Sequence, residues 1–271
     1  MKKLGIIGGM GPLATAYFYR RIVELTPAST DQEHIETLIY SCPSVPDRTA
    51  YLLSSRREVP APSATAPTVA DPRHERALQA APAERDGIGE TDLPADPRPK
   101  MIEVGRKLRE GGAEVLAIPC VTAHAFHKEL EEGIGVPVLH AIRELAVTCR
   151  ERNITRLGIM ATDGAMLSRI YDDILEDFGI TCLWPEENAQ KKVMSMIYDD
   201  VKAGRILSKS AFAEVERELF GAGAEAVVLG CTELSQATVT MDLGEKYIDI
   251  IDVLAQACVR ECADAKGEKN A

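Results

Sequence analysis

The sequence predicts an α/β fold made of two comparable halves, each a mostly parallel sheet flanked by helices. Its 271 residues are enough for two domains that each bury a core. Short apolar runs of strand length alternate with apolar residues at helical spacing, a pattern typical of parallel sheets covered by helices. An apolar run that leads into a cysteine with a threonine close behind occurs twice, which indicates two matching units.

The start of the chain predicts a strand, a glycine turn and a helix. Residues 4–7 form a short apolar run of the kind that a buried parallel strand shows. The glycines within residues 8–11 allow a tight turn, and Pro12 suits the first helical position because its missing N–H would be unpaired there. The helix then carries apolar side chains on one face: Ala14, Phe18, Ile22 and Leu25.

Two later strands each lead into a cysteine. Residues 115–118 predict a strand that ends just before Cys120, and residues 226–229 predict one that ends before Cys231. A helix over residues 123–130 is expected after the first of these cysteines. Because α/β proteins bind ligands at the carboxyl ends of their strands, both cysteines lie where a binding site is expected.

The first half of the chain is longer than the second. Gly5 and Cys120 are 115 residues apart, whereas the corresponding Gly158 and Cys231 are 73 residues apart. Residues 54–99 hold eight of the fifteen prolines and no aromatic residue. Such a composition cannot bury enough apolar surface to offset the entropy of the chain.

An irregular Ala/Pro-rich insertion at residues 54–95 therefore accounts for the extra length. The predicted first domain comprises residues 1–138 together with residues 246–271, and the insertion lies within it. The predicted second domain comprises residues 139–245.

Charge and cysteine content exclude several classes of protein. The chain has 31 Lys and Arg against 42 Asp and Glu, a net charge of −11, which argues against nucleic-acid binding. No apolar run reaches the roughly 18–20 residues that a membrane span needs. Seven irregularly spaced cysteines do not form a secreted disulfide framework, so a reducing, cytoplasmic setting is expected.

Two cysteines at matching strand ends suggest acid–base chemistry. A thiol near a helix N-terminus has a lowered pKa and favours the thiolate, and this is expected of both Cys120 and Cys231. Two such thiols facing each other across a cleft suit racemisation of an α-amino acid, since one can remove the α-proton while the other delivers a proton to the opposite face. A single cysteine at such a position is more often a small buried apolar residue.

Other residues give weaker signals. The glycines within residues 8–11 lack the spacing of a full dinucleotide-binding fingerprint. His124 and His127 lie near Cys120, but no second cluster has matching spacing, so no metal site is predicted. Arg48, on a charged loop, fits a two-pronged contact to a carboxylate and fits a solvated loop charge equally well.

Five motifs together resemble the aspartate/glutamate racemase family. They are residues 5–15 (GIIGGMGPLAT), 46–51 (PDRTAY), 119–124 (PCVTAH), 161–164 (ATDG) and 230–234 (GCTEL). The motifs follow the order of the family and span nearly the whole chain except residues 54–95. The resemblance implies two α/β domains related by a pseudo-twofold axis, with the active site in the cleft between them.

The resemblance also implies the chemistry and the residues of that site. It implies racemisation of aspartate or glutamate without pyridoxal phosphate, another cofactor or a metal, in a protein that forms a homodimer. Cys120 and Cys231 match the opposed acid and base, and Arg48 and Lys191 match contacts to the side-chain carboxylate of the substrate. Four further positions match the lining that holds the α-carboxylate and the amino group: Met10, Thr122, Thr162 and Thr232.

Three departures from the family pattern leave two other functions open. Val121 stands where the family usually has asparagine, Ser41 and Cys42 stand where two asparagines are common, and the insertion follows the Arg48 loop. One alternative is a related isomerase or decarboxylase of small dicarboxylates that needs a single cysteine. The other is a protein that binds dicarboxylates without catalysis.

Overall fold

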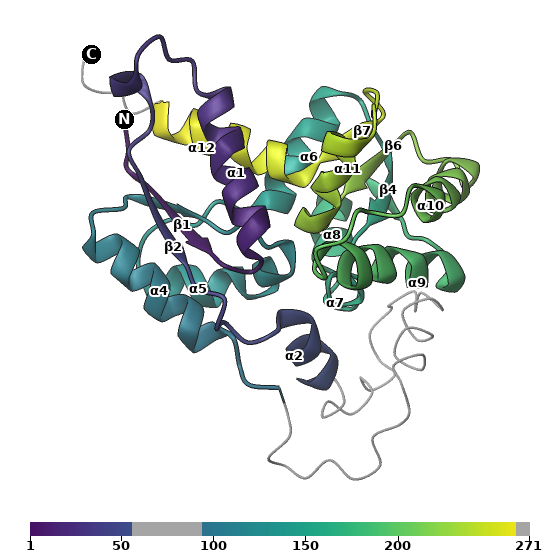
Figure 1. The fold of residues 1–271 in the computed structure, drawn as a ribbon, viewed down its shortest axis with the longest axis horizontal. Helices are drawn as coiled ribbons and strands as arrows, with labels where there is room; N and C mark the ends of the chain where they lie inside the picture. The colour runs from purple at the N-terminus through teal and green to yellow at the C-terminus, as the bar shows by residue number, and fades with distance from the viewer. Residues whose placement is uncertain (56–93, 264–271) are drawn as a thin grey trace.

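The computed structural model describes residues 1–55 and 94–263 (Figure 1). The insertion predicted at residues 54–95 therefore lies almost wholly outside the described residues. The described chain forms two parallel sheets with helices packed on them, which confirms the predicted α/β class. No helix within these two ranges is long and apolar enough to cross a membrane.

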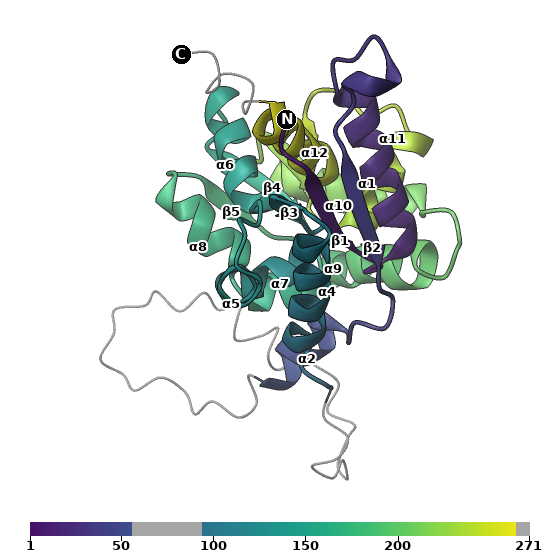
Figure 2. The same cartoon turned by 90° about the vertical axis from the view of Figure 1, so that its left-hand side faces the viewer.

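The first sheet is built around the strand predicted at the start of the chain. Its strands are all parallel, in the order β2-β1-β3: β1 (Leu4–Gly8), β2 (Thr37–Ser41) and β3 (Val115–Ala117). The pleat sends alternate side chains of β1 to opposite faces. Leu4 and Ile6 pack with α1 (Pro12–Leu25), whereas Ile7 packs with α4 (Arg98–Glu110) and α5 (His127–Ile134). Figure 2 shows α1 and α4 on either side of this sheet.

The second sheet repeats this topology and adds one strand. Its parallel strands run in the order β5-β4-β6-β7: β4 (Arg156–Met160), β5 (Thr181–Leu183), β6 (Ala226–Leu229) and β7 (Tyr247–Asp249). In both sheets the first strand along the chain is flanked by the second on one side and the third on the other. The duplicated unit expected from the sequence is therefore present in the strand order.

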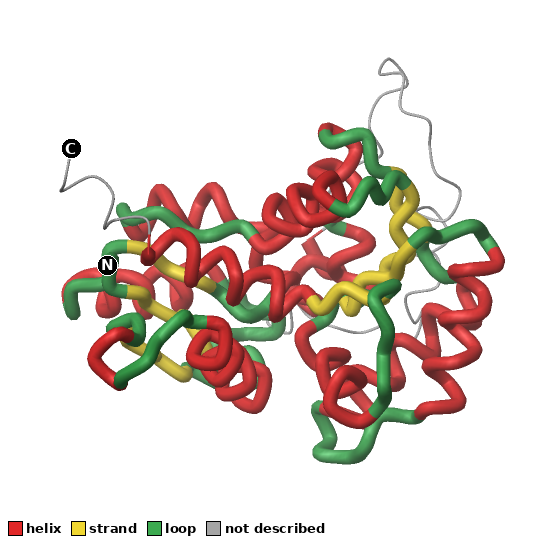
Figure 3. Tube along the Cα trace, turned by 90° about the horizontal axis from the view of Figure 1, so that it is seen from above, coloured by secondary structure: helices red, strands yellow, loops and turns green. Residues whose placement is uncertain are grey.

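Helices from both halves share the space between the sheets. One continuous core joins apolar residues of β1, α1 and β4 with those of α6 (Ala141–Glu151), α8 (Ile170–Asp177) and α12 (Ile250–Ala263). The outer face of the second sheet is covered by α9 (Glu187–Ser195) and α10 (Lys209–Gly221). Seen from above, α12 leaves the strands of the second sheet and runs back toward the first (Figure 3).

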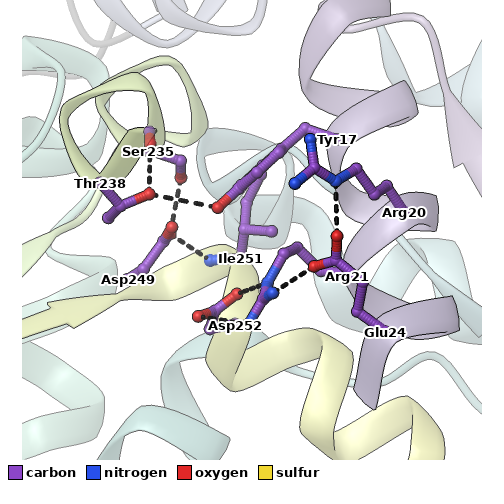
Figure 4. Close-up of polar contacts among 9 residues, drawn as sticks. All are labelled: Tyr17, Arg20, Arg21, Glu24, Ser235, Thr238, Asp249, Ile251 and Asp252. Carbon is purple, nitrogen blue, oxygen red and sulfur yellow. Dashed lines mark hydrogen bonds and ion pairs between the residues drawn. The ribbon is translucent and has the colours of Figure 1, made fainter. Parts of the chain in front are cut away.

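The last strand lies in the second sheet, whereas the last helix packs against helices of both halves, α1 and α6. The predicted division assigns residues 246–271 to the first domain, but β7 pairs with β6 in the second sheet. Only α12 returns: it packs against α1, and the N–H of Lys2 donates to the carbonyl of Cys262 at 3.1 Å. Polar contacts also join α1 to the C-terminal part of the described chain. Arg21 binds Asp252 of α12, and the hydroxyl of Tyr17 lies 3.2 Å from that of Thr238 (Figure 4).

The segments that follow the two cysteines differ from the expected helices. The helix predicted at residues 123–130 is wrong: a 3₁₀ segment (Val121–Phe126) comes first, and α5 begins only at His127. After Cys231 another 3₁₀ segment (Thr232–Ser235) precedes the short α11 (Gln236–Thr240). Apolar spacing cannot distinguish these tighter turns from an α-helix. The remaining short helices near the site are α2 (Arg48–Ser55) and α7 (Asp163–Leu167), and a π-helical segment spans Met196–Val201.

Candidate active site

The two strand-end cysteines line one small cavity of about 20 Å³. Cys120 follows β3 and Cys231 follows β6, and their exposed fractions are only 7% and 8%. Loops of both sheets build the wall, which consists of Met10, Asp47, Arg48, Thr49, Cys120, Val121, Thr122, Thr162, Tyr198, Lys202, Cys231, Thr232 and Glu233. Seven of the eight site residues expected from the sequence are thus brought together, and the eighth, Lys191, is not.

Arg48 approaches the cavity from the first turn of α2 and is 9% exposed. Backbone carbonyls hold its guanidinium: Nη1 donates to Pro46 at 3.0 Å and Nη2 donates to Met10 at 3.4 Å. Its buried Nε has no hydrogen-bond partner among the described residues. Burial is the largest influence and opposes the charge, but Cys120, Asp47 and Tyr198 together outweigh it, so the pKa of Arg48 is raised. Arg48 is therefore a cation held in a fixed position, and its Nε–H remains available to donate a hydrogen bond.

Cys231 lies beside a carboxylate. Its Sγ donates to Oε2 of Glu233 at 2.9 Å. Burial raises the pKa of the Cys231 thiol well above its usual value, and the Glu233 charge raises it further, while Lys202 opposes the rise. The expectation of a lowered pKa at this cysteine is therefore wrong. A four-residue 3₁₀ turn with an acidic residue in it does not offset the loss of water.

The second cation of the cavity is Lys202, not Lys191. Lys202 follows the π-helical segment, and its Nζ lies 2.6 Å from Oε1 of Glu233. Burial opposes the ammonium charge, but Glu233 outweighs it and raises the pKa of Lys202. Lys191 is on α9, where its side chain is 64% exposed and pairs with Glu187 at 2.6 Å. The structure thus places the ammonium implied by the resemblance eleven positions away from the lysine that we expected.

Three threonines line the cavity, and two of them connect the loops of the two sheets. The hydroxyls of Thr122 and Thr162 lie 3.1 Å apart, so the loop after β3 contacts the loop after β4 directly. Thr162 also accepts from the N–H of Ala165 and thereby caps α7. Thr232 donates to Oε2 of Glu233 at 3.3 Å. These contacts fix the positions of polar groups on both sides of the cavity.

A larger cavity of about 640 Å³ continues outward from the small one. Both cavities share the side chains that form the mouth between them: Met10, Asp47, Arg48, Lys202, Thr232 and Glu233. Beyond this mouth the wall is mainly apolar and includes Pro12, Leu13, Tyr17, Val45, Val201 and Val239. A small molecule can therefore place one end between the cysteines while the rest of it occupies the outer cavity.

The histidines near Cys120 form a stack in which the rings contact one another. The ring of His140 lies 5.0 Å from that of His124 and 4.6 Å from that of His127. Burial lowers the pKa of His124 to about 4 and that of His140 to about 2, so both are neutral at physiological pH. In the described part of the chain no group of three or more His, Cys, Asp or Glu residues is arranged to hold a metal ion.

Sequence reasoning missed three charged residues that line the small cavity: Asp47, Lys202 and Glu233. Glu233 stands within the GCTEL motif, two positions after Cys231, so its proximity could have been inferred from the spacing. Lys202 gives no such signal, because only the packing of the π-helical segment against the loop after β6 brings it to the cavity. The cysteines outside the site are free: Cys149, Cys258 and Cys262 are fully buried, and Cys182 is partly buried.

Comparisons with known proteins define the class of enzyme. Residues 63–258 match the family model described as Asp/Glu/Hydantoin racemase. The broad-specificity amino-acid racemase RacX of Bacillus subtilis (strain 168) is 24% identical over 262 residues, which cover 94% of each chain. The chain therefore belongs to the Asp/Glu/hydantoin racemase family and is an amino-acid racemase by class.

Solved structures show the same fold. The aspartate racemase of Picrophilus torridus aligns with a TM-score of 0.70 and 25% identity, over 97% of this chain and 94% of its own. The glutamate racemase of Francisella tularensis, solved with D-glutamate, aligns with a TM-score of 0.58 and 13% identity, over 98% of this chain and 82% of its own. The second similarity extends to the fold alone.

Proposed function

We propose that the protein racemises an acidic amino acid, aspartate or glutamate, between Cys120 and Cys231 without a cofactor. The observation that carries the proposal is the shared cavity. The thiols at the ends of β3 and β6 line one cavity together with Arg48 and Lys202. Two thiols are the acid and the base that inversion at carbon needs, and two cations suit a substrate with two carboxylates.

In the proposed reaction the substrate lies with its α-carbon between the two sulfurs. One sulfur, as thiolate, removes the α-proton, and the electron pair delocalises into the α-carboxylate. The other sulfur, as thiol, gives its proton to the opposite face, so the product is the other enantiomer and the two thiols have exchanged protonation states. The hydroxyls of Thr122, Thr162 and Thr232 supply hydrogen bonds for the α-carboxylate and the amino group.

The charged mouth and the outer cavity help to determine which substrates the site accepts. Arg48 has an unused Nε donor, and we propose that Arg48 and Lys202 bind the side-chain carboxylate. Val121 gives the inner wall an apolar surface, and the outer cavity leaves room for longer side chains. These features, with the name of the Bacillus subtilis relative as a broad-specificity enzyme, support a substrate range wider than aspartate.

Proton exchange in D₂O tests the function directly. L-aspartate and L-glutamate are incubated with the purified protein, without added cofactor, and followed by proton NMR and chiral analysis. We expect loss of the α-proton signal together with appearance of the D-enantiomer. No exchange with either amino acid would contradict the proposal and favour a binding protein.

Cysteine variants separate the racemase from the single-cysteine alternative. Because each sulfur has a separate role, Cys120→Ala and Cys231→Ala should each lower racemisation by roughly 10²–10⁴-fold or more. Circular dichroism checks that both variants keep the fold. A variant of either cysteine that turns over a dicarboxylate at the rate of the wild type would instead indicate an isomerase or decarboxylase that needs one thiol.

We also propose that the enzyme is a homodimer and functions in the cytoplasm. The dimer follows from the resemblance to the family, and sedimentation equilibrium tests it. The reducing location is supported by the seven cysteines, all of which are free.

A further inference from the structure

Glu233 contacts three functional groups of the site but has no role in the reaction described above. It is buried, with an exposed fraction of 7%. Its Oε2 accepts from the Cys231 thiol at 2.9 Å and from the Thr232 hydroxyl at 3.3 Å, and its Oε1 lies 2.6 Å from the Lys202 ammonium. Both carboxylate oxygens are thus engaged, one with the sulfur and one with the cation.

The charge beside Cys120 has the opposite sign. There the neighbour is the buried guanidinium of Arg48, which lines the same small cavity and adds no competing negative charge. A cation next to a sulfur favours its thiolate, whereas a carboxylate that accepts the S–H hydrogen favours the thiol. The two cysteines occupy matching places in the two sheets, so this difference in charge distinguishes them.

We propose that Glu233 is a positioning residue that keeps the proton on Cys231 in the resting enzyme, which leaves the role of the base to Cys120. The inference rests on the proposed function, since it assigns the two roles that racemisation requires. The resting enzyme then accepts the enantiomer whose α-proton faces Cys120. One turnover moves that proton to Cys120 and the proton of Cys231 to the substrate.

The enzyme must then return to its resting form. After turnover Cys231 is a thiolate next to the Glu233 carboxylate, with Lys202 as the counter-ion of both. Two adjacent anions are unfavourable, so Cys231 regains a proton from water while Cys120 releases one. No net proton is consumed. Glu233 ensures that the exchange returns the proton to Cys231 and not to Cys120.

Values of kcat/KM cannot reveal which cysteine holds the proton in the resting enzyme. The two enantiomers have equal free energy in water, so kcat/KM must be the same in both directions whatever the resting protonation state. The test therefore measures the thiols themselves. Iodoacetamide is reacted with the full-length protein across a range of pH, and mass spectrometry gives the alkylation rate of each cysteine. The midpoint of each rate profile reports protonation, whereas its plateau reports access.

In the wild type we expect the midpoint of Cys231 to lie above that of an ordinary thiol, because its S–H donates to the Glu233 carboxylate. Glu233→Gln should move the Cys231 midpoint down by at least about one pH unit, because it removes the carboxylate and leaves Lys202 beside the sulfur. Lys202→Met should move the same midpoint up. The Cys120 midpoint should stay in place in Glu233→Gln, and the surface variant Glu214→Gln, which removes a carboxylate paired with Lys192, should change neither.

An unchanged Cys231 midpoint in Glu233→Gln, or an equal shift of both cysteines, would overturn the inference. If Glu233→Gln does not fold, the Lys202→Met profile decides alone, and a midpoint that stays put or falls contradicts the proposal. These outcomes do not depend on turnover. A protein that shows the predicted midpoints but no exchange of α-protons would refute the racemase function and leave the thiol assignment intact.

Discussion

At the scale of single residues, the site combines groups whose charges are set by burial and by one neighbour each. Lys202 keeps its charge in a mostly buried position because Glu233 lies 2.6 Å away. Arg48 keeps its charge because backbone carbonyls and the Cys120 sulfur surround it. The cavity therefore holds two charged donors, a guanidinium and an ammonium, already in place before a ligand enters.

Replacing Lys202 tests its proposed contact with the side-chain carboxylate. Lys202→Gln should raise KM for aspartate by roughly 10- to 100-fold, which is the usual loss for one charge-assisted hydrogen bond. The matched variant Lys191→Gln changes a lysine on the surface of α9 and should leave KM within about twofold. Steady-state kinetics with both enantiomers measures the effect. A larger loss in Lys191→Gln would restore the assignment made from the sequence.

Replacing Gly9 tests the importance of the tight turn between β1 and α1. Its φ is +93°, and a β-carbon added there would lie 2.3 Å from the backbone nitrogen of Cys42. Gly9→Ala should therefore destabilise the protein by roughly 2–5 kcal/mol, through both backbone strain and a clash with the end of β2. Gly179 has a φ of +73° but no atom within 4 Å of such a β-carbon, so Gly179→Ala should cost only about 1–2 kcal/mol. Urea unfolding compares the two, and equal losses would contradict the close approach.

At the scale of elements, β7 ends in a buried carboxyl that links the last strand to the loop after Cys231. Asp249 is 8% exposed, and its Oδ1 accepts from the Ser235 hydroxyl at 2.6 Å and from the N–H of Ile251 at 2.9 Å (Figure 4). Its Oδ2 has no partner in the described ranges. Burial raises the pKa of Asp249 from 3.8 to about 6, although both hydrogen bonds oppose the rise.

The raised pKa of Asp249 predicts how stability changes with pH. Between pH 4 and pH 6 the folded state holds a proton that the unfolded state has lost, so this group contributes stability below pH 4 that disappears as pH rises through 6. The loss amounts to roughly 3 kcal/mol. Asp249→Asn should remove this part of the pH dependence, as shown by urea unfolding of both proteins at pH 4.5 and pH 7.5.

A carboxylate on the surface serves as the control for Asp249. Asp173 is 62% exposed and pairs with Arg169, so Asp173→Asn should keep the wild-type slope of stability against pH. If Asp249→Asn kept that slope too, the pKa of Asp249 in the folded protein could not be raised by its burial.

Strands were easier to predict from the sequence than the segments that follow them. The runs at residues 4–7, 115–118 and 226–229 are almost entirely apolar because both faces of these parallel strands are buried, and each forms a strand. The 3₁₀ segments after Cys120 and Cys231 have side-chain patterns that also fit an α-helix. Lys202 could not be predicted at the site because its position depends on contacts between distant elements.

At the scale of the whole molecule, the small cavity lies where loops of both sheets meet, so a ligand there would contact both halves at once. We propose a division at residues 138 and 139, with β7 in the second half and α12 alone returning to the first. A dicarboxylate that bridges the two halves should stabilise them together. The shared core of α1, α6 and α12 supports unfolding in one step.

Thermal unfolding with added succinate tests this bridge. At 100-fold excess over its dissociation constant, a ligand that binds only the folded protein adds about 2.7 kcal/mol of stability. For a chain of this size that corresponds to an increase in Tm of roughly 5–10 °C. Acetate at the same concentration carries one carboxylate and should give a much smaller shift. Arg48→Gln should lose most of the succinate effect, and a full effect in this variant would contradict the role of Arg48.

The return of α12 to α1 also affects how the protein is made. On the ribosome β1 and α1 emerge before the second sheet, but the face of α1 that α12 covers stays bare until α12 has been translated. The second sheet has all its strands before α12 appears. The half that is synthesised first is therefore the last to be finished, and a nascent chain exposes the apolar side chains Phe18 and Ile22 to chaperones throughout that interval.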